Sequence, residues 1–162
     1  MLGYPEGFAV LEFQIPWLQL LLVAAFRNLL GVVWYSPLLF GAAWARSTGC
    51  TQAEMRRRLL PMLPVEYFCS FVIAFVLAQV LNFGGAIDWK MGAFVGLLMA
   101  LGFVAAGTPN QVMYARRPRG AWLVDAGFSV VSLMAMGVVM ATWRWDGLIR
   151  TALRQGLARV AQ

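Results

Sequence analysis

Residues 121–143 read AWLVDAGFSVVSLMAMGVVMATW, and the only charged side chain in this run is Asp125. A helix that crosses a lipid bilayer needs about 20 consecutive, predominantly apolar residues. The run has that length, and tryptophans stand near both of its ends, at Trp122 and Trp143. Tryptophan is enriched where a spanning helix meets the membrane surface. Residues 121–143 are therefore predicted to form a membrane-spanning helix.

Three further apolar runs precede this one. They cover approximately residues 16–35 (PWLQLLLVAAFRNLLGVVWY), 61–83 (PMLPVEYFCSFVIAFVLAQVLNF) and 89–107 (WKMGAFVGLLMALGFVAAG). Four such runs in 162 residues leave too little polar surface for a bundle in water. The sequence therefore predicts an all-α fold, an integral membrane four-helix bundle that forms a single domain over residues 1–162.

The composition agrees with a membrane protein. Hydrophobic residues make up 61% of the chain and charged residues 12%, whereas soluble domains have roughly 45–50% apolar and about 25% charged residues. These proportions exclude a disordered chain, a fibrous protein and an ordinary soluble enzyme. The net charge of +6 comes from arginines that stand between the apolar runs, so it indicates membrane topology rather than binding of nucleic acid.

Residue types that many catalytic sites require are missing from the sequence. The chain has no histidine, which excludes imidazole ligation of metals or haem and histidine-based acid–base catalysis. The sequence also lacks a nucleophile elbow, a phosphate-binding loop, zinc-ligand spacing and a dinucleotide fingerprint. We therefore expect no catalytic residues, no metal site and no cofactor.

The longest connection, residues 36–60, contains a helix signal. Thr51 and Glu54 stand three positions apart, as in a capping box at the start of a helix. They predict a short interfacial helix over about residues 52–60, which ends near Pro61.

Charges outside the spans bear on orientation. The first and third loops hold seven arginines, whereas the opposite side holds Lys90 and four arginines of the tail. Positive charge in short loops favours the cytoplasm, so we predict both termini outside, with the basic tail as a contrary signal. That tail, residues 144–162, has apolar residues at helical spacing. It is predicted to be an amphipathic helix lying on the membrane, with a frayed polar tail as the alternative.

Charged residues are expensive within a bilayer, so each one there is a candidate functional residue. At a rise of about 1.5 Å per residue, Arg27 lies roughly 12 Å from one membrane face, and Glu66 and Asp125 lie about 7–8 Å from that same face. We predict a shared polar cluster in this leaflet. The cluster comprises Arg27, Asn28, Glu66, Asp125, Ser129 and Ser132.

Two interpretations of this cluster are open. In one it only fixes the packing of the helices, and in the other it binds a ligand or an ion. Helical side chains lean toward the N-terminus of their own helix, so Arg27 leans away from the shared face while Glu66 and Asp125 lean toward it. This geometry is unfavourable for a simple ion pair and leaves open which group compensates the charge of Arg27.

Small residues recur along the third span. Gly92, Gly96 and Ala100 are four residues apart, and Gly107 follows them. Small residues at this spacing let two helices approach closely. We expect the stripe to pack within the protein, with a dimer interface as the alternative.

The segment after the first span has a distinctive pattern. Residues 31–41 read GVVWYSPLLFG and are followed by Trp44, and residues 125–133 of the last span read DAGFSVVSL, with Gly137 beyond. Both segments resemble the bacterial and fungal membrane family known as domain of unknown function 1761. The resemblance extends from about Trp17 to Trp143. It implies a four-helix membrane protein, no known activity and no catalytic residues. We expect the protein to lie in the bacterial cytoplasmic (inner) membrane.

The first of these motifs also has a physical interpretation. Proline cannot continue a helix and disfavours helical geometry in the residue before it. The aromatic pair at the end of the span anchors the exit from the bilayer, the apolar residues that follow turn back toward the interface, and a glycine permits the next reversal. This interpretation is structural rather than catalytic. The motif residues are Gly31, Trp34, Tyr35, Pro37, Phe40, Gly41 and Trp44.

Competing functional hypotheses follow. The first is a non-enzymatic membrane protein that acts through helix–helix contacts, as an accessory or assembly subunit. Its partners would be the lipid bilayer, other membrane subunits or a second copy of the chain. The alternative is a small carrier or channel for an ion or small solute that uses the intramembrane Arg/Glu/Asp cluster. An enzyme acting on lipid is a third and weaker idea, because no motif supports it.

Overall fold

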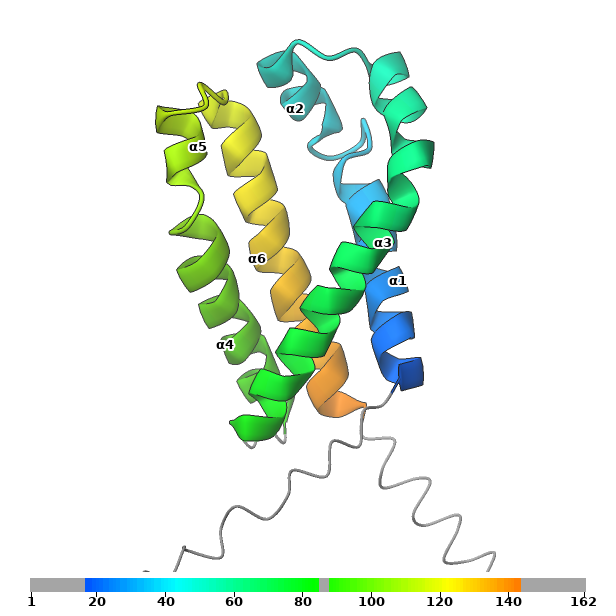
Figure 1. The fold of residues 1–162 in the computed structure, drawn as a ribbon, viewed down its shortest axis with the longest axis vertical. Helices are drawn as coiled ribbons and strands as arrows, with labels where there is room; N and C mark the ends of the chain where they lie inside the picture. The colour runs from blue at the N-terminus through cyan, green and yellow to red at the C-terminus, as the bar shows by residue number, and fades with distance from the viewer. Residues whose placement is uncertain (1–16, 85–87, 144–162) are drawn as a thin grey trace, which may run out of the picture.

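The computed structural model describes residues 17–84 and 88–143, and these residues form a bundle of long helices (Figure 1). The chain runs up and down the bundle, and short helices lie in two of its connections. In chain order the elements are α1 (Trp17–Trp34), α2 (Gly41–Thr48), α3 (Gln52–Phe83), α4 (Trp89–Met99), the π-helix η1 (Ala100–Ala105), α5 (Pro109–Met113) and α6 (Arg119–Thr142).

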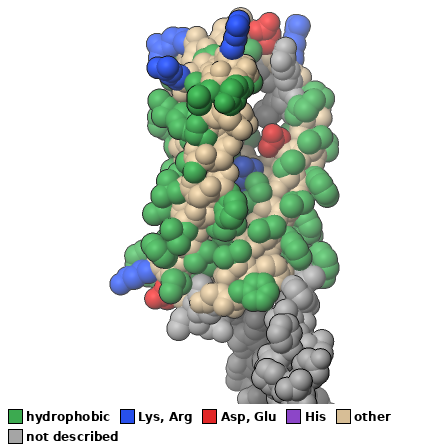
Figure 2. All heavy atoms as spheres, turned by 60° about the vertical axis from the view of Figure 1, so that its left-hand side comes forward, with side chains coloured by type: hydrophobic (Ala, Val, Ile, Leu, Met, Phe, Trp, Pro, Cys, Tyr) green, Lys and Arg blue, Asp and Glu red, His purple; other side chains and the backbone are tan. Residues whose placement is uncertain are grey.

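The predicted all-α fold with four apolar spans is confirmed. Four segments are long and apolar enough to cross a membrane, namely Trp17–Trp34, Pro61–Phe83, Trp89–Met113 and Arg119–Thr142. Most of their surface faces outward, and Figure 2 shows hydrophobic side chains over the length of the bundle. Leu29, for example, is 67% exposed. Such a surface suits the lipid of an integral membrane protein.

Two helix pairs build the bundle. The most extensive contact joins α4 to α6, and the next joins α1 to α3. Helix α2 packs on α6, and in Figure 1 α2 and α5 lie at the same end of the molecule, which we call the α2 end. Contacts between α3 and α4 are few, and the two helices diverge toward the α2 end (Figure 1).

The apolar core lies mainly in the half of the bundle away from the α2 end. It combines the first turns of α1 with the second half of α3 and the second half of α6. A buried amide closes this end, since Gln19 Nε2 donates to the backbone oxygens of Met140 (3.3 Å) and Trp143 (3.1 Å). The core residues are Leu20, Val23, Ala74, Leu77, Ala78, Leu81, Ala100, Leu133, Met136 and Met140.

The first connection is confirmed in part. The capping box is present, because Thr51 Oγ1 accepts from Glu54 N at 3.2 Å and Thr51 N donates to Glu54 Oε2 at 2.8 Å. The expected end near Pro61 is wrong, because α3 continues through Pro61 and Pro64. Each proline removes one backbone donor from the helix. The carbonyls left without that donor lie in the part of α3 before the apolar segment, where water can reach them. The short helix of this loop is α2 instead, and it ends at Gly49 (φ 71°).

The third span changes helix type part-way along. Helix α4 passes into η1, where Ala106 N donates to the carbonyl oxygen of Leu101, five residues back, at 2.9 Å. A π-turn contains one residue more than an α-turn, so it rotates the faces of the helix that follow it. The predicted polar loop beyond this span contains α5. Residues 144–162, predicted as an amphipathic helix, lie outside the described residues.

The small residues of α4 lie against α6. A Cβ at Gly92 would overlap the carbonyl oxygen of Gly137, and a Cβ at Gly96 would lie 2.7 Å from the carbonyl carbon of Leu133. Ala100 is fully buried. Gly107 departs from this stripe, since it is exposed and its nearest neighbour is the backbone of Phe103 in its own span. The π-turn between Ala100 and Gly107 accounts for the change of face.

Candidate functional site

The polar residues predicted as one cluster form two separate centres. One surrounds the carboxylate of Asp125 near the start of α6, and the other surrounds the guanidinium of Arg27 in the middle of α1. Within residues 17–84 and 88–143, Arg27 makes no ion pair with any carboxylate. The two centres therefore need separate descriptions.

The Asp125 carboxylate accepts from three side chains. Its Oδ1 accepts from the Tyr35 hydroxyl at 2.7 Å and from Trp44 Nε1 at 3.1 Å. Its Oδ2 forms an ion pair with Arg117. We call Asp125, Tyr35, Trp44 and Arg117 the carboxylate centre. It joins the turn after α1, helix α2, the loop after α5 and helix α6.

The sequence motif around Pro37 produces the geometry of this centre. Helix α1 ends at Trp34, and Gly41 N donates to the Ser36 carbonyl oxygen at 3.0 Å. A Cβ at Gly41 would overlap the carbonyl oxygen of Tyr35 and lie 2.7 Å from that of Ser36. Only glycine therefore lets α2 begin so close to the end of α1. This close approach places Trp44 beside Tyr35, with ring centroids 6.2 Å apart.

A second tryptophan holds the turn between α1 and α2, which we call the α1–α2 elbow, against α6. Trp34 Nε1 donates to the carbonyl oxygen of Val124 at 3.2 Å. Its ring lies 4.4 Å from that of Phe40, centroid to centroid, and a Cβ at Gly127 would lie 3.4 Å from its Cζ2 atom. The two segments that carry the family resemblance, residues 31–44 and 125–133, thus meet each other in space.

Tyr35 lies in the turn beyond the α1 span and acts as a neutral donor. Burial raises the pKa of its phenol, and the hydrogen bond to Asp125 raises that pKa further. Both effects disfavour the phenolate, so the hydroxyl keeps its proton and continues to donate to the carboxylate.

Arg117 is the member of the carboxylate centre that the sequence reasoning did not find. Because Arg117 lies outside the apolar runs, its sequence position indicates only a charge that sets topology. The preceding residue, Arg116, has a positive φ of 51°. Arg117 Nη1 also donates to Gln111 Oε1 at 2.7 Å, which fixes the side chain. Its position eight residues before Asp125, across a proline, gives no helical-spacing signal.

The second centre contains Arg27 and two neutral partners. Arg27 Nη1 donates to Ser70 Oγ at 2.9 Å, and its Cζ lies 5.1 Å from the centroid of the Phe128 ring. Its Nε is buried and has no hydrogen-bond partner among the described residues. Glu66 attracts it electrostatically, but the Glu66 side chain is exposed. We call Arg27, Ser70 and Phe128 the arginine centre.

Phe128 links the two centres. Its ring centroid lies 5.5 Å from that of Tyr35 and 6.1 Å from that of Trp34. A Cβ at Gly31 would lie 3.4 Å from the Phe128 Cζ atom, so glycine at this position gives the ring its space. The arginine and the carboxylate thus lie on either side of an aromatic layer.

The remaining polar residues of the predicted cluster bond to backbone. Asn28 Nδ2 donates to the Ala24 carbonyl oxygen of its own helix at 2.9 Å. Ser129 Oγ donates to the Asp125 carbonyl oxygen at 2.9 Å, and Ser132 Oγ donates to that of Ser129 at 3.3 Å. They bring no charge to Arg27, and no described residue supplies the fork of acceptors that a guanidinium can engage.

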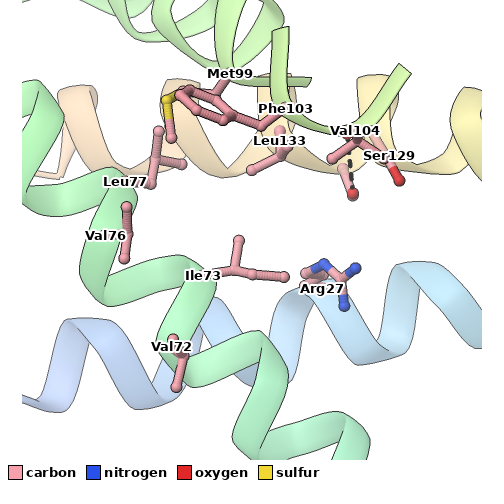
Figure 3. Close-up of a pocket in the computed structure, with 11 residues that line it drawn as sticks. Arg27, Val72, Ile73, Val76, Leu77, Met99, Phe103, Val104, Ser129 and Leu133 are labelled. Carbon is pink, nitrogen blue, oxygen red and sulfur yellow. Dashed lines mark hydrogen bonds between the residues drawn. The ribbon is translucent and has the colours of Figure 1, made fainter. Parts of the chain in front are cut away.

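A cavity of about 340 Å³ adjoins Arg27. Its walls come from α3, the junction of α4 and η1, and α6, and most of them are apolar. Figure 3 shows Arg27 at one end of the space, near Ser129 and Val104, and Leu77 and Met99 at the other end. The arrangement is a largely apolar pocket that is partly open to the outside, with a cation at one end. Among the described residues no group of three His, Cys, Asp or Glu side chains is placed to hold a metal ion.

The family model described as "Protein of unknown function (DUF1761)" matches residues 18–141. The chain belongs to this family. The match covers both DUF1761 motif segments, and it therefore includes the carboxylate centre, the arginine centre and the cavity. Neither the curated proteins nor the solved structures contain a match to the chain.

Proposed function

We propose that this DUF1761 protein is a multi-pass membrane protein that binds an anionic ligand within the bilayer, with Arg27 as the anion-binding residue. The single observation behind the proposal is the position of Arg27 at the end of a cavity, where it forms no ion pair with a described residue. The proposal corresponds to the ligand-binding alternative of the sequence analysis rather than to the accessory-subunit hypothesis.

The energetic cost of Arg27 supports a binding role. The residue is eight positions before Tyr35, so it lies about 12 Å into the span. An arginine at the centre of a spanning helix costs roughly 2.5–3.5 kcal/mol on insertion scales. Ser70 and Phe128 reduce this cost, since a hydroxyl accepts a hydrogen bond and an aromatic face attracts a cation. Neither partner neutralises the charge, whereas a bound anion would.

Of the two carboxylates in the predicted cluster, Asp125 already has partners of its own. Asp125 accepts from Tyr35 and Trp44 and pairs with Arg117. Moving it toward Arg27 would leave Arg117 and two half-buried donors without their acceptor. We therefore assign Asp125 to the docking of the α1–α2 elbow on α6, and Arg27 to the ligand.

A thermal-shift experiment tests the binding role. The protein would be reconstituted in nanodiscs of zwitterionic phosphatidylcholine and titrated with benzoate, inorganic phosphate or laurate. A ligand that binds only the folded state raises the unfolding temperature. We expect at least one anion to raise it in the wild type and not in Arg27→Gln. Arg119→Gln removes the same charge from an exposed position and serves as the matched control. Equal shifts in the wild type and Arg27→Gln for every anion would contradict the proposal.

The charge distribution supports an orientation. The exposed residues Arg46, Arg57 and Arg119 lie in or next to the connections at the α2 end, where Figure 2 shows most of the cationic side chains. Lys90 is at the start of α4, at the opposite end. Because positive residues in short loops favour the cytoplasm, we propose that the α2 end faces the cytoplasm of a bacterial inner membrane and that both termini lie outside.

The accessory-subunit hypothesis requires a surface for partners. The small-residue face of α4 lies against α6, so a partner would have to use another face. Native mass spectrometry after gentle extraction tests this function. A co-purifying protein would support an assembly role, and a monomer with a bound small molecule would support the ligand-binding role.

A further inference from the structure

We propose that the ligand of the cavity is a single-chain amphiphile with a carboxylate head, such as a long-chain fatty acid. This inference rests on the proposed function and assigns the chemical class of the anion. Its head would bind Arg27, and its chain would lie along the apolar walls toward Leu77 and Met99.

The free edge of the guanidinium favours a carboxylate head. Ser70 occupies Nη1, and within the described residues Nε has no partner and Nη2 makes no hydrogen bond. Nε and Nη2 form one edge of the planar guanidinium, and two parallel hydrogen bonds from one edge match the two oxygens of a carboxylate. Nε is buried, so a carboxylate that engages both nitrogens must displace the atoms that now cover Nε. This edge of Arg27 is then a two-point carboxylate site in a segment that is short of water.

The walls of the cavity favour an apolar chain behind that head. Beyond Arg27, the polar lining residues are Ser129 and Ser132, whose hydroxyls donate to backbone oxygens. Toward the far end the lining side chains are apolar, and Figure 3 shows Ile73, Val76 and Leu77 of α3 lining the cavity between Arg27, which belongs to α1, and Met99. A small hydrophilic anion would leave this part of the cavity unfilled.

The size and position of the cavity favour one chain that enters from the lipid. A volume of about 340 Å³ is near the lower end of the roughly 300–1,000 Å³ of ordinary ligand pockets, which suits one chain better than the paired chains of a phospholipid. The cavity lies between α3 and the α4–η1 segment, where contacts between α3 and α4 are few. Val76 and Phe103 line the cavity and are themselves partly exposed to the bilayer side. A fatty acid could therefore enter sideways.

Photo-crosslinking tests the assignment on the full-length protein in phosphatidylcholine nanodiscs. The probe is a palmitic acid analogue with a diazirine in the middle of its chain, and mass spectrometry of peptides locates the labelled residues. We expect labelling of cavity residues on α3 and η1. Unlabelled palmitate should compete at least about tenfold better than hexadecanol, which has the same chain without the charge. Acetate, which has the charge without the chain, should not compete.

Two pairs of variants separate the head from the chain. Arg27→Gln should reduce cavity labelling about tenfold, and Arg119→Gln should leave it unchanged. Val104→Trp should block labelling by filling the cavity near Ser129, whereas Val131→Trp adds the same side chain at an exposed position of α6 that does not line the cavity. If a variant does not fold, the comparison of palmitate with hexadecanol on the wild type still decides the question.

The outcomes distinguish this inference from the proposed function. Equal competition by hexadecanol, or labelling confined to outward-facing residues such as Phe68 and Phe94, would overturn the fatty-acid assignment. If benzoate or phosphate stabilises the protein through Arg27 while the palmitate probe leaves the cavity unlabelled, the proposed function stands and this inference fails. If no anion acts through Arg27, both fail.

Discussion

The two charged residues at the centre of the site differ in how their charges are compensated. Asp125 has three donors within its own chain, and one of them, Arg117, also carries the opposite charge. Arg27 has a hydroxyl, an aromatic face and one buried nitrogen without a partner. A buried charge with its partners contributes to stability only modestly, and a buried charge without them reduces it. We therefore expect opposite effects when the two residues are replaced.

Replacing Asp125 should destabilise the protein. Asp125→Asn keeps an acceptor for Tyr35 and Trp44 but turns an amide donor or a neutral oxygen toward Arg117. Hydrogen bonds to charged groups are worth about 1.5–3 kcal/mol. Because Arg117 is 36% and Asp125 24% exposed, solvent screening lowers the expected loss for the pair below this range, to about 1 kcal/mol. A double-mutant cycle with Arg117→Gln, measured by unfolding in mixed micelles, should give a coupling energy of about 1 kcal/mol. Additive effects would show that the pair contributes nothing.

Replacing Arg27 should stabilise the protein. Arg27→Met removes a charge that lacks an anionic partner and keeps an apolar stem, so the free energy of unfolding should rise by about 1 kcal/mol in the absence of ligand. The same measurement applies, and Arg119→Met is the control at an exposed position. A fall of more than 1 kcal/mol would mean that Arg27 serves to fix helix packing, the other interpretation of the cluster.

The arginine and carboxylate centres also show what sequence can reveal about a site. Arg27 and Asp125 were identifiable because an isolated charge within an apolar run is conspicuous. Tyr35 and Trp44 stood out as motif residues, but Arg117 did not, because it reaches Asp125 through the path of the loop after α5. Hydropathy also does not pair Ser70 with Arg27. Whether Arg27 shares a cluster with the carboxylates depends on how each helix is rotated about its own axis. Hydropathy does not specify this rotation, so the prediction of one shared cluster could not be secure.

At the scale of the helices, the close backbone contact between α4 and α6 depends on glycine at particular positions. Gly92 and Gly137 face each other, and Gly96 faces the backbone of Leu133. Without an apolar driving force between helices in lipid, such contacts depend on van der Waals packing of small residues. This interface therefore depends on the absence of Cβ atoms at a few positions.

Gly96→Ala should weaken the bundle. The added methyl would press on the Leu133 backbone, which has no flexible side chain to move away, and overpacking of this kind costs about 1–3 kcal/mol. Gly102→Ala is the matched control, because a Cβ there has nothing within 4 Å. Thermal unfolding of the two variants in the same detergent checks the difference. Equal stability of the two would contradict the contact between α4 and α6.

Some boundaries of the helices can be predicted from local sequence, and others depend on tertiary structure. The spans and the capping box at Thr51 follow from local pattern, so the sequence predicts them well. The continuation of α3 through Pro61 and the π-turn after Met99 do not. A proline predicts a helix end, whereas α3 continues because the carbonyls that lose their donors at Pro61 and Pro64 lie before the apolar segment. A π-turn has no residue signature that distinguishes ALGFVA from an ordinary α-helical run.

At the scale of the whole molecule, the polar features are concentrated at the α2 end. The carboxylate centre, the exposed arginines of the connections and the diverging part of α3 lie there, while the apolar core occupies the other half. The DUF1761 match spans both halves. The well-packed half with the apolar core and the α2 end, where α3 and α4 diverge, therefore both belong to the matched region.

The proposed orientation predicts a labelling pattern in intact bacterial cells. Ala42→Cys in α2 and Gly84→Cys after α3 lie at opposite ends and change no charge. In a background without the native cysteines, a membrane-impermeant maleimide should label Gly84→Cys in intact cells and Ala42→Cys only after the cells are opened. The reverse pattern would place the α2 end outside and overturn the orientation.

The uneven distribution of the core also has a consequence for how the bundle fluctuates. Local opening of a folded chain needs least free energy where few apolar contacts must separate. Backbone amides in the second halves of α3 and α6, next to Leu77 and Met136, should therefore exchange their hydrogens only in rare, nearly global openings. Amides of η1 next to Phe103, an exposed residue of the cavity wall, should exchange in smaller and more frequent ones, so that a ligand can come and go while the far end of the bundle stays closed.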